Sequence, residues 1–103
     1  MQQERVEAIK DESALFGAME AERRAKAQRE AAKRVLAQRR QELGQLRARC
    51  DMRFSSLTPV EEVMEAHTRT QALRWLIECI EREVDDLDLQ CHQHREKVQQ
   101  LLN

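Results

Sequence analysis

The fold is decided by the stretch Leu73–Leu101, which reads LRWLIECIEREVDDLDLQCHQHREKVQQL. In this stretch, apolar or weakly polar residues recur at alternating steps of four and three, and the residues between them are mostly charged or amide. The repeat comprises Leu73, Ile77, Ile80, Val84, Leu87, Cys91, His94, Val98 and Leu101. An average spacing of about 3.5 residues is typical of a coiled-coil seam, the row of side chains that two helices bury between them.

The same spacing continues backwards through Thr70, Ala66 and Val63. A helix with one narrow apolar edge is not stable alone in water, because too little of its surface can be buried. The second half of the chain therefore requires a partner helix, and the first half is the obvious candidate.

Residues 3–50 predict this partner, because Ala, Glu, Gln, Arg and Lys dominate them and all are good helix formers. A seam is clearest in the last third, where Arg39 interrupts an otherwise apolar row. The row consists of Ala32, Leu36, Leu43, Leu46 and Cys50. No single heptad frame fits the apolar residues from end to end, so we expect a stutter at about residues 25–32.

Residues 51–58 predict a turn, and the second helix is expected over 59–101. Thr58 is expected to cap that helix, Pro59 suits its first position, and Glu61 completes a capping box. A short turn between two long helices makes them antiparallel neighbours. The predicted fold is all-α, an antiparallel coiled-coil hairpin in a single domain over 1–103, with helices of roughly 65–70 Å at 1.5 Å per residue.

The composition agrees with a long-helix protein, since 36% of the residues are charged, 3% are aromatic, and there are two Gly and one Pro. Residues 1–58 carry 13 Lys/Arg and 9 Asp/Glu, whereas residues 59–103 carry 5 and 10. This asymmetry favours attraction between the halves over binding of a polyanion. We expect the acidic residues between Glu78 and Asp88 to lie opposite residues 25–35.

Location is predicted from what the chain lacks. The N-terminus MQQERVEAIKDE has no apolar core, so we expect no signal peptide. No apolar run reaches the roughly 20 residues of a membrane span. Cys50, Cys79 and Cys91 are an odd number without framework spacing, which indicates reduced thiols and a cytoplasmic protein.

The stretch Cys91-His92-Gln93-His94 places three potential metal ligands close together in the sequence, but a helix does not place all three on one face. On a helix, Cys91 and His94 share the seam face while His92 points elsewhere, so two ligands are too few for a closed zinc site. We interpret Cys91 and His94 as seam residues and expect no metal or cofactor. No nucleophile, acid–base pair or phosphate loop stands out, so we predict that the protein is not an enzyme.

Trp75 and the basic stretch Arg23–Arg53 are the candidates for partner binding. Trp75 is expected on the face opposite the seam, either packed on neighbouring side-chain stems or serving as an apolar anchor for another protein. The basic stretch has eleven Lys/Arg, which are explained by a solvated face with pairing to the second helix or by contact with an acidic protein. Nucleic acid is disfavoured, because aromatic residues are not interleaved with the basic ones.

The layout resembles the FliJ/YscO family of flagellar and injectisome type III secretion, small charged antiparallel coiled-coil proteins. The resemblance rests on the basic first helix ERRAKAQREAAKRVLAQRRQEL (Glu22–Leu43) and the Trp-bearing QALRWLIECIEREVDDL (Gln71–Leu87). It implies a central stalk that enters and regulates the export ATPase and contacts the export gate and chaperones. Residues expected to face outward are the guesses for partner contact, namely Arg23, Arg24, Arg39, Arg40 and Trp75.

Two other functions remain open. One is a cytoplasmic chaperone or adaptor that lends its helices to a helical client, as small helical bundles such as tubulin-binding cofactor A do. A seam of alanines in the middle of the first helix favours it, because that seam buries little and could open for a client helix. A homodimeric scaffold with four helices and no client is the other.

Overall fold

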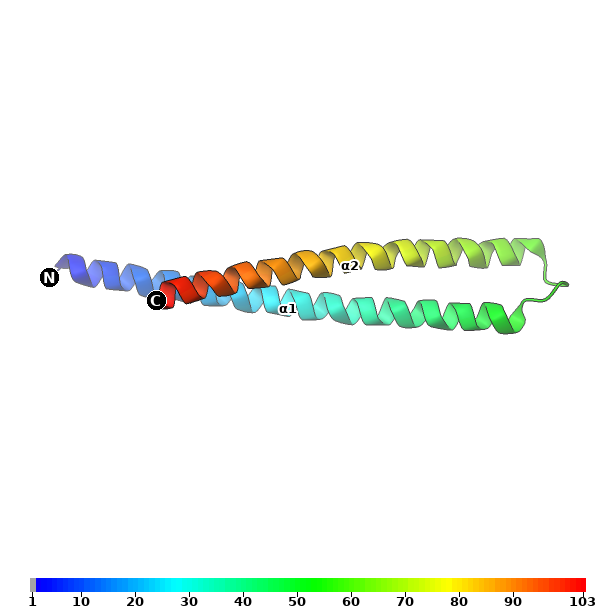
Figure 1. Ribbon diagram of the computed structural model, residues 1–103, viewed down its shortest axis with the longest axis horizontal. Helices are drawn as coiled ribbons and strands as arrows, with labels where there is room; N and C mark the ends of the chain where they lie inside the picture. Colours follow the sequence, from blue (N-terminus) through cyan, green and yellow to red (C-terminus); the bar gives the residue numbers. More distant parts are fainter. Residues whose placement is uncertain (1) are drawn as a thin grey trace. The chain divides into compact units, whose positions relative to one another are not determined.

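The computed structural model is all-α, with two long helices packed against each other in an antiparallel hairpin (Figure 1). Helix α1 spans Gln2–Arg53 and helix α2 spans Val60–Leu102. The structure describes the backbone of residues 2–103 and the side chains of residues 12–51 and 53–103. The predicted fold class is confirmed.

The contacts divide the hairpin into two units, each with one segment of either helix. Unit 1 comprises Met1–Ala31 and Val84–Asn103, and unit 2 comprises Ala32–Glu83. Unit 2 therefore contains the turn, and unit 1 contains both chain ends.

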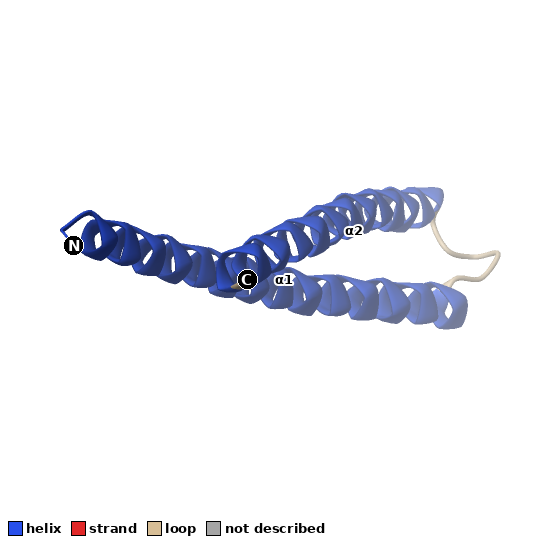
Figure 2. Ribbon diagram, turned by 60° about the vertical axis from the view of Figure 1, so that its left-hand side comes forward, coloured by secondary structure: helices blue, strands red, loops and turns tan. Residues whose placement is uncertain are grey.

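In unit 1, small residues of α1 face larger residues of α2. The buried side chains are Ala18, Ala25, Val84, Leu87, Cys91 and Val98. Helix α1 begins beyond the end of α2, so its first turns have no helix beside them (Figures 1 and 2). Phe16 and Met19, which follow these first turns, are exposed.

In unit 2, burial is confined to the part remote from the turn. Leu36, Ile77 and Ile80 are buried, but no described side chain from residue 37 to residue 76 is. The two helices lie farther apart toward the turn in both views (Figures 1 and 2). The turn-proximal half of unit 2 is thus a loosely packed coiled coil.

Over residues 15–50, the seam of α1 contains charged residues and has no stutter, which corrects the prediction for residues 25–32. Side chains that are not exposed recur at steps of three and four, and they include Leu15, Ala18, Glu22, Ala25, Arg29, Ala32, Leu36, Arg39, Leu43, Leu46 and Cys50. The apolar residues alone break the frame because Glu22, Arg29 and Arg39 occupy three of its positions. Long charged side chains can cover a seam with their aliphatic stems while their heads reach water.

The turn differs from the prediction at both ends. Helix α1 continues through Arg53, three residues past its expected end, and the Phe54 amide still donates to the Cys50 carbonyl at 3.1 Å. Helix α2 begins at Val60, and the Pro59 carbonyl accepts from the amides of Glu62 and Val63.

Thr58 closes the turn and does not cap α2. The Ser55 amide donates to Thr58 Oγ1 at 2.8 Å, and the Thr58 amide donates to the Ser55 carbonyl at 3.1 Å. The predicted capping box does not form, because the Thr58 hydroxyl accepts from the Ser55 amide and the carbonyl that accepts the first bonds from α2 amides belongs to Pro59.

Among the described side chains, each unit has one ion pair between the helices. In unit 1, Arg29 lies 3.6 Å from Asp88, which agrees with the expected position of the acidic residues opposite 25–35. In unit 2, Arg40 lies 3.0 Å from Glu81, which extends this pairing beyond the expected stretch. Helical side chains lean toward the N-terminus of their own helix, so a long arginine side chain can contact a carboxylate that is displaced along the helix axis from its own Cα. All four side chains are partly exposed, so these pairs select the register more than they stabilise it.

Candidate protein-interaction surface

The five residues guessed as partner contacts are divided between the two units. Trp75 is 68% exposed. Arg23 and Arg24 are exposed in unit 1, and Arg23 pairs with Glu20 at 2.8 Å. Arg40, in unit 2, is engaged with Glu81.

Arg39 is a correction, because it does not face outward. It is half-buried in the seam of α1, its Nη1 donates to both carboxylate oxygens of Glu42 at 3.0 Å, and its Nε is covered without a hydrogen-bond partner. It is therefore a poor contact for a partner.

The residues predicted for the seam differ in burial along the hairpin. Leu36, Ile77, Ile80, Val84, Leu87 and Val98 are buried, whereas Leu43, Leu46 and Leu73 are half-buried. Leu101 is 40% exposed, which corrects its place in the seam. Leu101 lies in the last turn of α2, where few residues follow it that could cover its side chain. Within unit 2, the predicted seam residues with the least cover are Leu43, Leu46 and Leu73.

The Cys91–His94 stretch is part of the packing in unit 1. Cys91 is buried, His94 is half-buried, and His92 points to solvent with its Nε2 3.1 Å from Glu96. Within the described residues, no three His, Cys, Asp or Glu side chains are grouped closely enough to hold a metal ion. A search of the same residues for a helix with the length and hydropathy needed to cross a membrane finds none.

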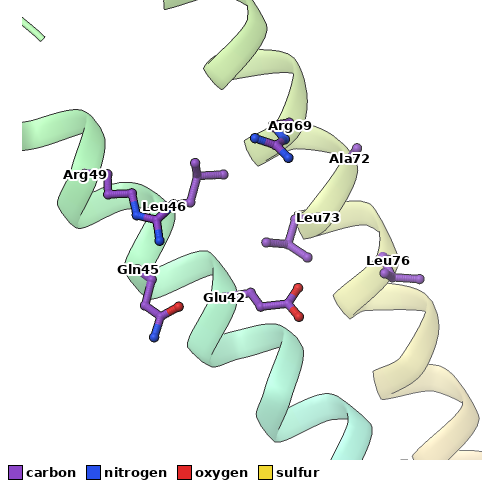
Figure 3. A pocket seen from close by; sticks show the side chains of 8 residues that line it. All are labelled: Glu42, Gln45, Leu46, Arg49, Arg69, Ala72, Leu73 and Leu76. Atoms are coloured by element: carbon purple, nitrogen blue, oxygen red, sulfur yellow. The ribbon is translucent and has the colours of Figure 1, made fainter. Parts of the chain in front are cut away.

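The larger pocket of unit 2 lies across the loosely packed part of the seam, with a volume of about 470 Å³. Leu46, Leu73, Ala72 and Leu76 supply its apolar lining (Figure 3). Its polar lining comes from Glu42, Gln45, Arg49 and Arg69. Leu46 and Leu73 point into the space between the helices, where a denser seam would have closed over them (Figure 3).

A second pocket of about 320 Å³ opens along the other edge of the same seam. Its apolar lining is Cys50, Phe54, Val63 and Ala66. Its polar lining is Arg47, Asp51, His67, Thr70 and Arg74. Both pockets are open at a level where the two helices lie farther apart than in the buried part of the seam (Figures 1 and 2).

Four arginines surround these pockets, and we call Arg47, Arg49, Arg69 and Arg74 the arginine set. Each pocket is lined by one member from α1 and one from α2. No member forms an ion pair with a carboxylate of the described residues, and residues 45–50 and 69–76 contain no Asp or Glu. Positions beside a coiled-coil seam normally carry opposite charges, as Arg40 and Glu81 do. Each pocket thus has an arginine on either helix, together with one acidic residue, Glu42 in the larger pocket and Asp51 in the smaller one.

The sequence interpretation did not find the arginine set. The basic stretch Arg23–Arg53 includes Arg47 and Arg49, whereas Arg69 and Arg74 lie outside it. The signal was available in the sequence as two arginines on either side of the turn, within stretches (45–50 and 69–76) that contain no Asp or Glu. Recognising it requires the register between the helices, which the turn prediction gave only approximately.

Apolar side chains near the turn are also exposed. Leu57 is 91% exposed and Val60 is 71% exposed, and Met64 and Trp75 follow on the outside of α2. Uncovered apolar side chains of this size on a helical hairpin fit a protein-interaction role.

Comparison of the chain with protein-family models, with curated proteins and with solved structures finds no match. The proposed function therefore rests on the surface of unit 2.

Proposed function

We propose that this protein is a non-enzymatic interaction component that binds an acidic helical surface of a partner protein at the turn-proximal half of unit 2. The observation that carries the proposal is the arginine set around two open, apolar-lined pockets. An amphipathic helix recognises such a groove through apolar side chains spaced along one face. Here those side chains would cover Leu46 and Leu73, and flanking carboxylates would meet the arginines.

Electrostatics supports an acidic partner. Like charges facing each other beside a seam destabilise a helix pair by about 0.5 kcal/mol or less per pair. A carboxylate placed between Arg49 and Arg69, or between Arg47 and Arg74, removes this repulsion and gains charge-assisted hydrogen bonds. Complementary charge also raises the rate of association and disfavours basic partners.

The partner class that the sequence supports is the export ATPase of type III secretion. This choice rests on the resemblance of Glu22–Leu43 and Gln71–Leu87 to the stalk proteins of that system, and on the all-α hairpin that such a stalk requires. In this function the protein acts as the central stalk and regulates ATP hydrolysis without catalysing it.

The test is ATP hydrolysis by a purified type III export ATPase with and without the full chain. We expect the wild-type chain to change the rate, and the variant R47Q/R74Q or R49Q/R69Q to lose most of the effect. The matched control is R34Q/R95Q, which removes the same charge from two exposed arginines outside the arginine set. If the wild-type chain neither binds the ATPase nor changes its rate of hydrolysis, the ATPase is not the partner. If the control variant loses the effect equally, the arginine set is not the binding site.

A helical chaperone or adaptor is the second candidate, and one observation in unit 1 favours it. The α1 side of that seam is made of Ala18, Glu22, Ala25 and Arg29, and the Nε of Arg29 is covered without a hydrogen-bond partner. Such a seam gives little stabilisation, so a client helix could replace α1. A sharp, cooperative thermal unfolding of the isolated chain would contradict this function.

A further inference from the structure

The outside of α2 in unit 2 carries a second row of residues with coiled-coil spacing. We call it the outer stripe, and it consists of Glu65, Thr68, Ala72, Trp75, Cys79 and Arg82. The steps between its members alternate three and four, as they do in the seam, but the row lies on the opposite face of the helix. Five of the six residues are exposed, and Cys79 is half-buried.

The middle of the outer stripe is uncharged over about 16 Å, from Thr68 to Cys79. Thr68 donates its hydroxyl to the Met64 carbonyl at 2.9 Å, so its hydrogen-bonding need is met within α2. Trp75 is 68% exposed between Ala72 and Cys79. This combination of a large aromatic residue with small neighbours matches a packed helix interface better than a solvated face.

The outer stripe is complementary to itself when two copies of α2 run antiparallel. One alignment places Trp75 against Ala72 of the second copy, and it also places Cys79 against Thr68 and Arg82 against Glu65. Each of these layers occurs twice by symmetry, as in any interface built on a two-fold axis. Large side chains meet small ones in the centre, and opposite charges meet at both ends.

The charges at the ends are available for this pairing. Neither Glu65 nor Arg82 forms an ion pair with another described residue. The next residues in the same rows, Glu61 and Asp86, are both acidic and would repel each other, so the alignment ends after six layers.

We propose that two copies of this chain associate through the outer stripes of their α2 helices, antiparallel and with Trp75 packed on Ala72 of the second copy. The proposal goes beyond the ATPase-partner function and does not depend on it. The outer stripe shares only Ala72 with the larger pocket and no residue with the smaller one, so the dimer leaves the smaller pocket open. A six-layer interface is small, and we expect a dissociation constant on the order of micromolar or weaker.

The oligomeric state of the full chain tests the proposal by sedimentation equilibrium up to about 0.5 mM. We expect a monomer–dimer equilibrium that W75A abolishes, while helicity measured by circular dichroism stays unchanged. The matched control is L89A, because Leu89 is an equally outward apolar residue of α2 (57% exposed) outside the outer stripe. A wild-type chain that stays monomeric, or a W75A chain that dimerises as well as the wild type, would overturn the proposal.

Charge reversal tests the alignment. We expect E65R or R82E alone to weaken association about tenfold, because each places like charges together in two layers, and we expect the double variant E65R/R82E to recover within about twofold. Failure of the double variant to recover association would overturn the antiparallel pairing of Glu65 with Arg82.

Cross-linking tests the same alignment without relying on affinity. With Cys50 and Cys91 replaced by Ser, we expect T68C to form a disulfide with Cys79 of the second copy. Cys79 alone should not cross-link, because the two Cys79 residues are 11 positions apart along the stripe, about 16 Å, which is too far for a disulfide. Cross-linking through Cys79 alone would indicate a parallel pair and overturn the proposal.

Discussion

At the residue scale, the two sides of the seam are built from different chemistry. From Ala66 to Val98, the seam positions of α2 carry mostly aliphatic side chains. This seam could be predicted because the apolar residues mark its positions in the sequence. On α1, Glu22, Arg29 and Arg39 hold equivalent positions through their stems. The pattern of apolar residues showed Arg39 as the gap in its row, but it could not reveal Glu22 and Arg29, because the same side chains occur on solvated faces.

The contribution of a buried seam residue to the free energy of unfolding can be measured at Ile80. Replacing it by Ala removes a buried side chain that is only 8% exposed, and we expect the free energy of unfolding to fall by about 2–3 kcal/mol. Denaturant unfolding followed by circular dichroism measures this loss. L89A on the same helix should change the free energy by less than about 0.5 kcal/mol, because Leu89 is exposed. A comparable loss in both variants would contradict the assignment of Ile80 to the seam.

Arg39 offers the opposite prediction. Its Nε is covered and unpartnered, so the variant R39L removes an unmet donor and adds apolar surface to the seam. We expect R39L to stabilise the hairpin by about 1 kcal/mol in urea unfolding, as replacement of poorly satisfied charges by apolar residues often does. R40L removes the exposed Arg40–Glu81 pair and should be neutral or slightly destabilising. If R39L were the less stable of the two, the covered Nε would not be a cost.

At the element scale, the local sequence determines where each helix forms, whereas the geometry of the turn depends on which amide donates to the Thr58 hydroxyl. Pro59 indicated the start of α2 to within one residue, because proline suits the beginning of a helix, and the helix itself begins at Val60. The role of Thr58 could not be predicted, since its hydroxyl can accept equally from an amide of α2 or from Ser55. The geometry of the turn decided in favour of Ser55.

Gly44 weakens α1 without serving the fold. A Cβ built there meets nothing within 4 Å, and no glycine has a positive φ. We therefore expect G44A to raise the free energy of unfolding by about 1 kcal/mol, the difference in helix propensity between the two residues. The reverse change A48G, at another exposed position one turn away, should lower it by a similar amount in the same urea titration. A loss of stability in G44A would mean that glycine is needed at this position.

At the scale of the whole molecule, the antiparallel pairing was predictable because a short turn between long helices leaves few alternatives. The loosening toward the turn was not predictable. Leu43, Leu46 and Leu73 are the same kinds of residue as those in the buried part, and their exposure depends on the separation of the helix axes. The arginine set was missed for a related reason, because it exists only once the two helices are aligned.

Hydrogen exchange should reveal this gradient within unit 2. Amides in residues 43–50 and 66–73 lie beside the half-buried part of the seam, and those in residues 77–83 lie beside the buried part. We expect the former to exchange faster by mass spectrometry, because local opening costs less where few apolar contacts are lost. Uniform protection along unit 2 would show that the seam is equally stable throughout.

Trp75 is the single tryptophan of a chain that has no tyrosine, and its indole is mostly in contact with solvent. Intrinsic fluorescence therefore comes almost entirely from one site outside the seam. Its emission should shift to shorter wavelength when something covers that site, and it should change little when the hairpin melts. The usual spectroscopic reporter of unfolding would thus serve, in this protein, as an unlabelled probe of what binds to the outside of α2.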